Sequence, residues 1–200
     1  TIMVAAKSKM GRHSLFFVQT SQADMLMHGQ FDTIYHEHIS FFSIDSMRKL
    51  AARSGLTMVA HSRVAIHGGS HIFVFMREDC AVKMGDIPNS ETRGIEIIDT
   101  FRENVRMVKH QFQKRIDKAR EDGRILVGYG AAAKGINFLN YCDVRLDFIV
   151  DETPSKQGLF TPKMHIQVVH PEFVRSLDIN IISWVILTWN YRDEVSKKIA

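Results

Sequence analysis

The sequence predicts an α/β protein whose C-terminal part is a parallel sheet flanked by helices. Three observations support this prediction. After residue 120, short apolar runs alternate with helix-like stretches, and strands that alternate with helices form parallel sheets. The first of these runs leads through a glycine-rich loop into a helix-like stretch. Residues 181–187 (IISWVIL) form an uninterrupted apolar run, which is typical of a central parallel strand.

The composition is that of an ordinary globular protein. The 200 residues are 45% hydrophobic and 24% charged, which suits one large domain or two small ones. No apolar run is long enough to span a membrane, and the N-terminus lacks the pattern of a secretory signal. Two distant cysteines suggest neither a disulfide framework nor a zinc site. We therefore expect a cytoplasmic protein, and a formal charge of only +4 argues against nucleic-acid binding.

The first eighty residues are expected to hold two helices, a strand and a hairpin. Ser43 is a suitable N-cap for the second helix, and Gly55 is a suitable stop. A turn signal at residues 67–70 joins two β-like runs. The stretch 21–39 looks irregular or weakly helical. The predicted elements are a helix at 2–10, a strand at 15–20, a helix at 44–53, and β-like runs at 56–66 and 71–77.

Residues 78–90 are rich in turn-forming residues and are the best candidate for a linker. A long amphipathic helix follows at about 91–121 and is expected to pack across a sheet. A coiled-coil dimer is the alternative, so a homo-oligomer stays open. The other predicted elements are a strand at 124–128, a helix at 132–142, strands at 146–150 and 166–169, a helix from Pro171, the strand at 181–187, and a helix at 191–200.

Proton-handling side chains are concentrated in residues 31–42 (FDTIYHEHISFF). Tyr35, His36, Glu37 and His38 are consecutive, within a stretch apolar enough to be buried. Burial and a neighbouring carboxylate can tune a histidine toward the operating pH, as a general base requires. Two alternatives stay open: a metal site built on the H-x-H pair, and histidines that only satisfy buried carbonyls. No further close ligand is evident, so we expect no metal.

The loop GYGAAAKG (residues 128–135) is a candidate phosphate site. Small residues before a helix let a phosphate approach the backbone amides, and Lys134 could add a positive charge. Asp151 ends the next predicted strand, where a ribose-binding acid lies in dinucleotide folds. The pattern that starts at Gly128 and Gly130 is not a true G-x-G-x-x-G, because its third glycine is displaced. A tight turn that needs glycine only for packing is therefore the alternative.

The predicted hairpin turn contains a second candidate contact. His67 and the backbone amides of Gly68 and Gly69 could lie beside a substrate, although a plain turn would need no function. Cys80 and Cys142 are expected to be packed thiols, because the sequence places no base or cation beside either one.

Four segments, in this order, resemble the C-terminal part of the nucleotide-sugar C-methyltransferases: FDTIYHEHISFFSIDSMRKL, IHGGS, VGYGAAAKGINFLNYC and FIVDETPSKQG. Such enzymes use S-adenosylmethionine to methylate a ring carbon of a keto-deoxy sugar carried on a nucleoside diphosphate. They combine a zinc-binding domain, a Rossmann-type methyltransferase domain and a C-terminal α/β domain that binds the nucleotide sugar. The resemblance implies that residues 1–80 are the end of a class I methyltransferase-like domain, and that residues 91–200 are the Rossmann-like nucleotide-sugar-binding domain.

The resemblance also implies roles for the residues of the motif. His38 would remove the proton beside the ketone, and the enolate carbon would then attack the methyl group of the sulfonium. Tyr35 and Glu37 would line and orient the sugar. Tyr35 or His36 would donate a hydrogen bond to the enolate oxygen. The residues expected to hold the nucleotide diphosphate are Gly128, Gly130, Lys134 and Asp151.

The sequence departs from the family pattern in several places. The zinc-binding domain and the loop that cradles S-adenosylmethionine are absent, so this chain alone is expected to hold the methyl donor poorly. QTSQADM stands where a Pro-Tyr pair is expected, and His71-Ile72 stand where Leu-Arg is more usual. Two alternatives stay open: a non-catalytic nucleotide-sugar-binding module, and a fragment of a nicotinamide-dependent oxidoreductase.

Overall fold

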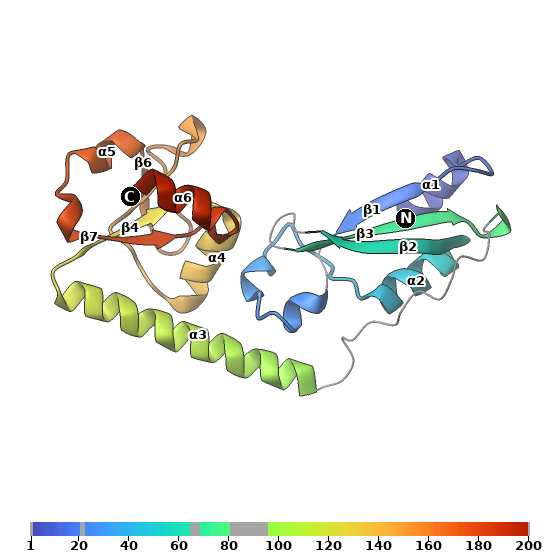
Figure 1. The fold of residues 1–200 in the computed structure, drawn as a ribbon, viewed down its shortest axis with the longest axis horizontal. Helices are drawn as coiled ribbons and strands as arrows, with labels where there is room; N and C mark the ends of the chain where they lie inside the picture. The colour runs from blue at the N-terminus through green and yellow to red at the C-terminus, as the bar shows by residue number, and fades with distance from the viewer. Residues whose placement is uncertain (1, 21–22, 65–68, 81–95, 200) are drawn as a thin grey trace. The chain divides into compact units, whose positions relative to one another are not determined.

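A computed structural model describes residues 2–20, 23–64, 69–80 and 96–199 of the chain (Figure 1). The chain divides into two compact units. The first holds Thr1–His28 and His38–Ile98, and the second holds Gly29–Glu37 and Asp99–Ala200. The short segment 29–37 therefore packs with a unit whose other residues are far away in the sequence.

The N-terminal unit is a three-stranded antiparallel sheet, in the strand order β1-β3-β2, with two helices. The elements confirm the predicted helices, strand and hairpin; of the turn predicted at 67–70, residues 67 and 68 lie outside the described residues. The Ser43 side chain accepts a hydrogen bond from the Ser46 amide at 3.1 Å, so Ser43 caps the second helix as predicted. The elements are α1 (Ile2–Lys9), β1 (Phe16–Thr20), α2 (Ile44–Arg53), β2 (Leu56–Val64) and β3 (Ser70–Arg77), with 3₁₀ turns at Ala23–Leu26 and Glu78–Cys80.

One face of this sheet is the core of the unit. Phe73 and Phe75 are fully buried on β3 and pack with Met3 of α1 and with Met47 and Ala51 of α2. On the opposite face, alternate residues are more accessible, because successive side chains of a strand point to opposite sides.

A polar cluster lies at one end of the buried face. The His61 and His71 rings are parallel, with their centroids 5.9 Å apart. One carboxylate oxygen of Asp24 lies 3.5 Å from His71 Nε2 and 3.3 Å from Arg63 Nε. Burial lowers the pKa of His71, although Asp24 opposes the effect and His61 and Arg63 reinforce it. His71 is therefore held in its neutral form near neutral pH.

This unit should lose stability as the pH falls from 7 to 5. Because the pKa of His71 is lower in the folded than in the unfolded state, the unfolded chain takes up the proton first. Urea denaturation midpoints at the two pH values measure the loss, and His71→Leu should reduce it. The exposed His13→Gln is the control and should keep the wild-type pH dependence. Equal pH dependence in wild type and His71→Leu would contradict the prediction.

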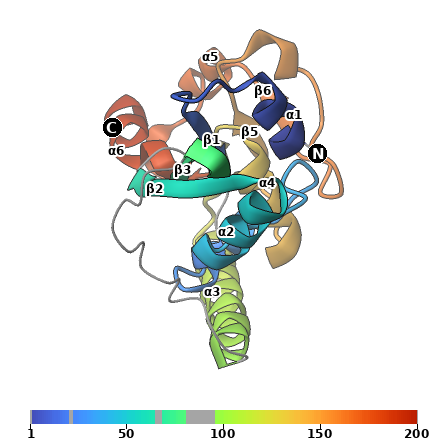
Figure 2. The same ribbon diagram turned by 90° about the vertical axis from the view of Figure 1, so that its right-hand side faces the viewer.

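The C-terminal unit is a four-stranded parallel sheet, in the order β6-β5-β4-β7, with helices around it (Figures 1 and 2). This confirms the predicted α/β fold with a parallel sheet. The elements are α3 (Glu96–Glu121), β4 (Ile125–Tyr129), α4 (Ala133–Cys142), β5 (Phe148–Val150), β6 (Gln167–Val169), α5 (Pro171–Arg175), β7 (Ile182–Ile186) and α6 (Arg192–Ile199), with 3₁₀ turns at Phe31–Thr33, Pro154–Lys156, Ile179–Ile181 and Trp189–Tyr191.

The two faces of the parallel sheet have separate cores. Leu126 of β4 joins a cluster that includes Ile116 of α3 and Leu139 of α4. The next residue, Val127, joins a second cluster that includes Val174 of α5. The sheet is thus covered on both faces, as a parallel sheet requires.

The prediction that residues 181–187 form a central strand is wrong. Within the described residues, β7 pairs with β4 alone and lies at an edge of the sheet, while β4 and β5 lie inside it. The apolar run reflects contacts on the two faces of the strand, because Ile182 and Trp184 join one core cluster and Val185 the other. Covering both faces of a strand does not require a neighbour on both of its edges.

None of the described helices combines the length and the hydrophobicity that are needed to cross a bilayer.

Candidate functional site

The carboxyl ends of β4 and β7 mark the place where a ligand is expected. From β4, the chain continues to β5 and β6 on one side, whereas β7 lies on the other side of β4. In open α/β sheets, ligands bind outside the carboxyl ends of the strands at such a reversal of strand order. The glycine-rich loop follows β4 here, and the stretch from Thr188 follows β7.

Close packing accounts for the glycines of this loop. A Cβ on Gly128 would lie 2.8 Å from Ile149 Cγ1, and one on Gly135 would lie 2.4 Å from Leu187 Cβ. Gly130 has φ +87°, a backbone conformation that favours glycine. The packing alternative considered from the sequence thus explains all three positions, and a phosphate contact at Gly128 or Gly130 stays a prediction.

The first turn of α4 is a candidate anion site. Its N-cap is Ala132, which gives no side-chain hydrogen bond to the turn. In this arrangement an anion can take the place of a cap, because the helix N-terminus carries unpaired amides and the positive end of the dipole. Lys134, in the same turn, adds a positive charge beside these amides.

Hydrogen bonds within the protein hold the Asp151 carboxylate in place. It accepts hydrogen bonds from the Ala131 amide at 2.7 Å, the Thr153 amide at 2.8 Å and Lys156 Nζ at 3.0 Å. Burial alone would raise the pKa of Asp151, but these hydrogen bonds hold it below its ordinary value. Asp151 thus ties the glycine-rich loop to the loop after β5, and its predicted contact with a nucleotide stays a prediction.

The segment 29–37 is attached to α4 by specific contacts. Asn137 Nδ2 donates to the backbone oxygen of Ile34 at 2.9 Å and lies 3.2 Å from that of Asp32. The Phe31 ring lies 4.8 Å from the Tyr141 ring, measured between centroids. One helix therefore carries both Lys134 and the residues that hold the segment leading into the motif.

Asp32 and Trp189 complete this arrangement. Trp189 Nε1 donates a hydrogen bond to Asp32 Oδ2 at 2.7 Å. The Lys134 ammonium lies over the Trp189 ring, 5.1 Å from its centroid, as in a cation–π contact. Burial lowers the pKa of Lys134, and the charge of Asp32 opposes this shift.

Two of the four motif residues are exposed, so the prediction of a buried stretch holds only in part. Burial is limited to Phe31–Thr33, whereas Tyr35 is half-buried and His36 and Glu37 are exposed. Burial, Glu37 and Asp32 all raise the pKa of Tyr35, so its hydroxyl stays protonated and able to donate.

His38 is half-buried, and its ring lies edge-on to the Phe41 ring with 6.0 Å between centroids. It is the first residue after segment 29–37 and falls in the N-terminal unit. The motif therefore spans the point where the chain passes from one unit to the other. His67 and Gly68 lie outside the described residues.

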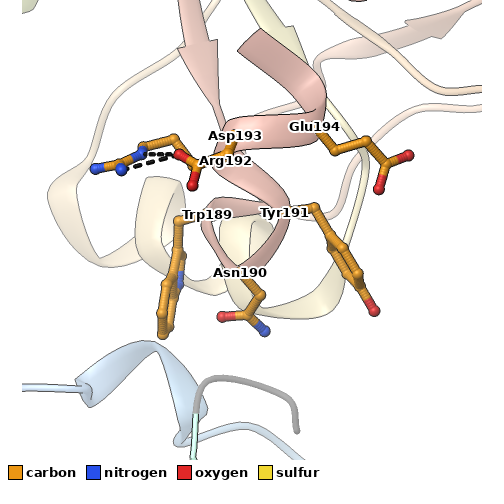
Figure 3. Close-up of a pocket in the computed structure, with 6 residues that line it drawn as sticks. All are labelled: Trp189, Asn190, Tyr191, Arg192, Asp193 and Glu194. Atoms are coloured by element: carbon orange, nitrogen blue, oxygen red, sulfur yellow. Dashed lines mark hydrogen bonds and ion pairs between the residues drawn. The ribbon is translucent and has the colours of Figure 1, made fainter. Parts of the chain in front are cut away.

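A pocket of about 420 Å³ opens beside the loop after β7 (Figure 3). Trp189, Asn190 and Tyr191 point to one side of this loop, while Arg192 pairs with Asp193 at 2.9 Å. Sequence reasoning missed Asp32, Asn137 and this loop. The position of the loop directly after a predicted strand was the signal that could have found it.

Two further predictions bear on the chemistry of the site. Cys142 is fully buried, and burial raises its pKa to about 11, so it is a packed thiol, as expected. Within the described residues, no group of three or more metal-binding side chains comes together.

Comparisons with known proteins place the chain in a family. Residues 65–200 match the family described as the C-methyltransferase C-terminal domain. The chain is 31% identical over 194 residues to the C-methyltransferase NovU of Streptomyces niveus, an alignment that covers 90% of this chain and 46% of NovU. The chain thus spans about half the length of this relative. From the family match and this similarity, the chain belongs to the C-methyltransferase C-terminal domain family.

Proposed function

We propose that this chain is the part of an S-adenosylmethionine-dependent C-methyltransferase that binds a nucleotide-linked keto-deoxy sugar and abstracts its proton. One observation carries the proposal. The segment that leads into the Tyr35–His38 motif is attached to the helix that presents Lys134, at the carboxyl edge of the sheet. A sugar near Tyr35 and a diphosphate near Lys134, both in the C-terminal unit, would then belong to one ligand.

In this proposal, His38 takes the proton from the carbon beside the ketone, and the electron pair of that C–H bond becomes the enolate. An imidazole suits this task because histidine is the side chain that most often serves as a general base. The protonated Tyr35 donates a hydrogen bond to the oxygen that gains charge. His36 is the second candidate donor, and Glu37 orients the sugar.

The diphosphate is bound by charge and by backbone amides. Lys134 and the uncapped first turn of α4 provide both, while Gly128 and Gly130 let the loop take its shape. Asp151 would contribute by holding this loop in place through the Ala131 amide.

The methyl donor would supply an electrophilic methyl group to the enolate carbon. The described residues of the N-terminal unit do not fit a site for it, because they include no glycine-rich strand-to-helix loop. The proton transfer is therefore the part of the reaction that we assign to this chain.

We also propose that residues 1–80 form the end of a larger sheet. Phe17 of β1 is 61% exposed, and β1 pairs through one edge with β3. The other edge of such a strand presents unpaired backbone groups with which a further strand can pair. A methyltransferase domain of Rossmann type that continues beyond β1 would provide that cover.

The proposal is tested by calorimetric titration of the 200-residue chain with thymidine and uridine diphosphates. Binding of either supports it. Absence of binding to both, or clear binding of NAD instead, would overturn the assignment of the glycine-rich loop.

Lys134→Ala should weaken nucleoside diphosphate binding by about tenfold or more, because a charge-assisted contact in a half-buried site is lost. The affinity of the wild-type chain should also fall as the pH rises. Because the pKa of Lys134 is lowered, this fall should begin at a lower pH than it would with an unperturbed lysine. The control Lys118→Ala removes the same charge from an exposed position of α3. Equal affinity in both variants would contradict the assignment.

A further inference from the structure

Asp32 is a buried carboxylate to which the proposed reaction gives no role. It is 6% exposed, and a buried carboxylate needs partners that compensate for lost hydration. One such partner is the Trp189 indole N–H, at 2.7 Å. The charge of Asp32 also acts on Lys134 and on Tyr35. One side chain is thus linked to both candidate ends of the substrate site.

Trp189 provides the physical connection between these groups. Its N–H is bound by Asp32, while its ring carries the Lys134 ammonium at 5.1 Å. The orientation of the ring therefore determines where the ammonium is held. Without the Asp32 contact, the ring is free to turn, and Lys134 loses the surface on which it rests.

We propose that Asp32 is a positioning residue for nucleoside diphosphate binding: by holding the Trp189 indole, it fixes Lys134 next to the segment that carries Tyr35. This inference rests on the proposed function. Lysine has a flexible side chain, and a site that is ordered before binding loses less freedom when the ligand arrives. Tyr35, which faces the sugar, and Lys134, which faces the diphosphate, would then be held in a fixed arrangement before the ligand binds.

The test is a double-mutant cycle on the 200-residue chain, read by calorimetry with thymidine and uridine diphosphates. Asp32→Ala removes the acceptor, and Trp189→Phe keeps an aromatic ring but removes the donor. Each should weaken binding by about tenfold. The double variant should bind no more weakly than the weaker single variant, because both substitutions break the same hydrogen bond.

Two matched controls separate this effect from general damage. Trp184→Phe makes the same chemical change at the other tryptophan of the chain, whose indole N–H is buried and has no hydrogen-bond partner among the described residues. Asp117→Ala removes an exposed carboxylate from α3. Both controls should bind like wild type. Thermal melting of every variant shows whether it is folded. If Asp32→Ala does not fold, Trp189→Phe alone tests the inference.

A rescue distinguishes positioning from a structural role. Asp32→Asn keeps an oxygen acceptor of the same size, so it should recover most of the affinity that Asp32→Ala loses. Wild-type affinity in Asp32→Ala and Trp189→Phe would overturn the inference, as would Asp32→Asn binding no better than Asp32→Ala. Failure of the wild-type chain to bind either diphosphate would overturn the proposed function together with the inference.

Discussion

Replacing His38 with alanine is expected to slow the exchange of the substrate proton beside the ketone with solvent by about 10²–10⁴-fold, the range of a lost general base. Exchange requires only that the proton leaves and that another returns to the enolate. It therefore tests the base without the methyl donor, for which the described residues of the N-terminal unit include no glycine-rich strand-to-helix loop. A nucleotide-linked keto-deoxy sugar in deuterated water, followed by proton NMR, provides the measurement.

The binding of nucleoside diphosphates should stay within about twofold of wild type in the same variant, because His38 does not contact the diphosphate in the proposed arrangement. His110→Gln, on the exposed side of α3, is the control and should exchange at the wild-type rate. Exchange at the wild-type rate in His38→Ala would contradict the role of His38 as the general base. Absence of exchange in the wild-type chain, with binding intact, would favour the alternative of a non-catalytic nucleotide-sugar-binding module.

Local features of the fold could be predicted because neighbouring residues encode them. Ser43 caps α2 through the Ser46 amide three residues later, and Pro171 begins α5 as predicted. The alternation of strands and helices after residue 120 was enough to predict a parallel sheet. The edge position of β7 could not be predicted, because an apolar run shows that the faces of a strand are covered and does not identify its neighbours.

The contacts that build the site are of a different kind. Asp32 and Trp189 are 157 residues apart, and neither belongs to a pattern that pairs them. Asn137 lies within a recognisable helix, but its bonds to the backbone of Ile34 depend on how a distant segment docks. The motif pointed to the right segment, whereas the partners of that segment required the tertiary structure.

Gly135 provides the other large expected effect, this time on stability. The displaced third glycine of the loop has no ligand-binding role predicted from the sequence, and in the structure it has a packing role. A Cβ here would lie 2.4 Å from Leu187 Cβ and 2.7 Å from the Leu187 backbone oxygen. A backbone oxygen cannot rotate away as a side chain can, so α4 itself would have to move off the sheet.

Gly135→Ala should therefore destabilise the C-terminal unit, although alanine is normally the better helix residue. The gain in helix propensity is about 1 kcal/mol, whereas overpacking a tight contact costs about 1–3 kcal/mol and occasionally more. We place the net loss at about 2 kcal/mol, since here the clash includes backbone. Urea denaturation followed by circular dichroism would measure it.

Gly123→Ala is the matched control within the same unit. Gly123 has φ +70° but nothing within 4 Å of an added Cβ, so its substitution costs only the backbone strain of about 1 kcal/mol. The difference between the two variants isolates the steric contribution. If Gly135→Ala were as stable as wild type, α4 could move away from β7 freely. In that case the position of Lys134, the residue before Gly135 in α4, would not depend on the contact between Gly135 and Leu187.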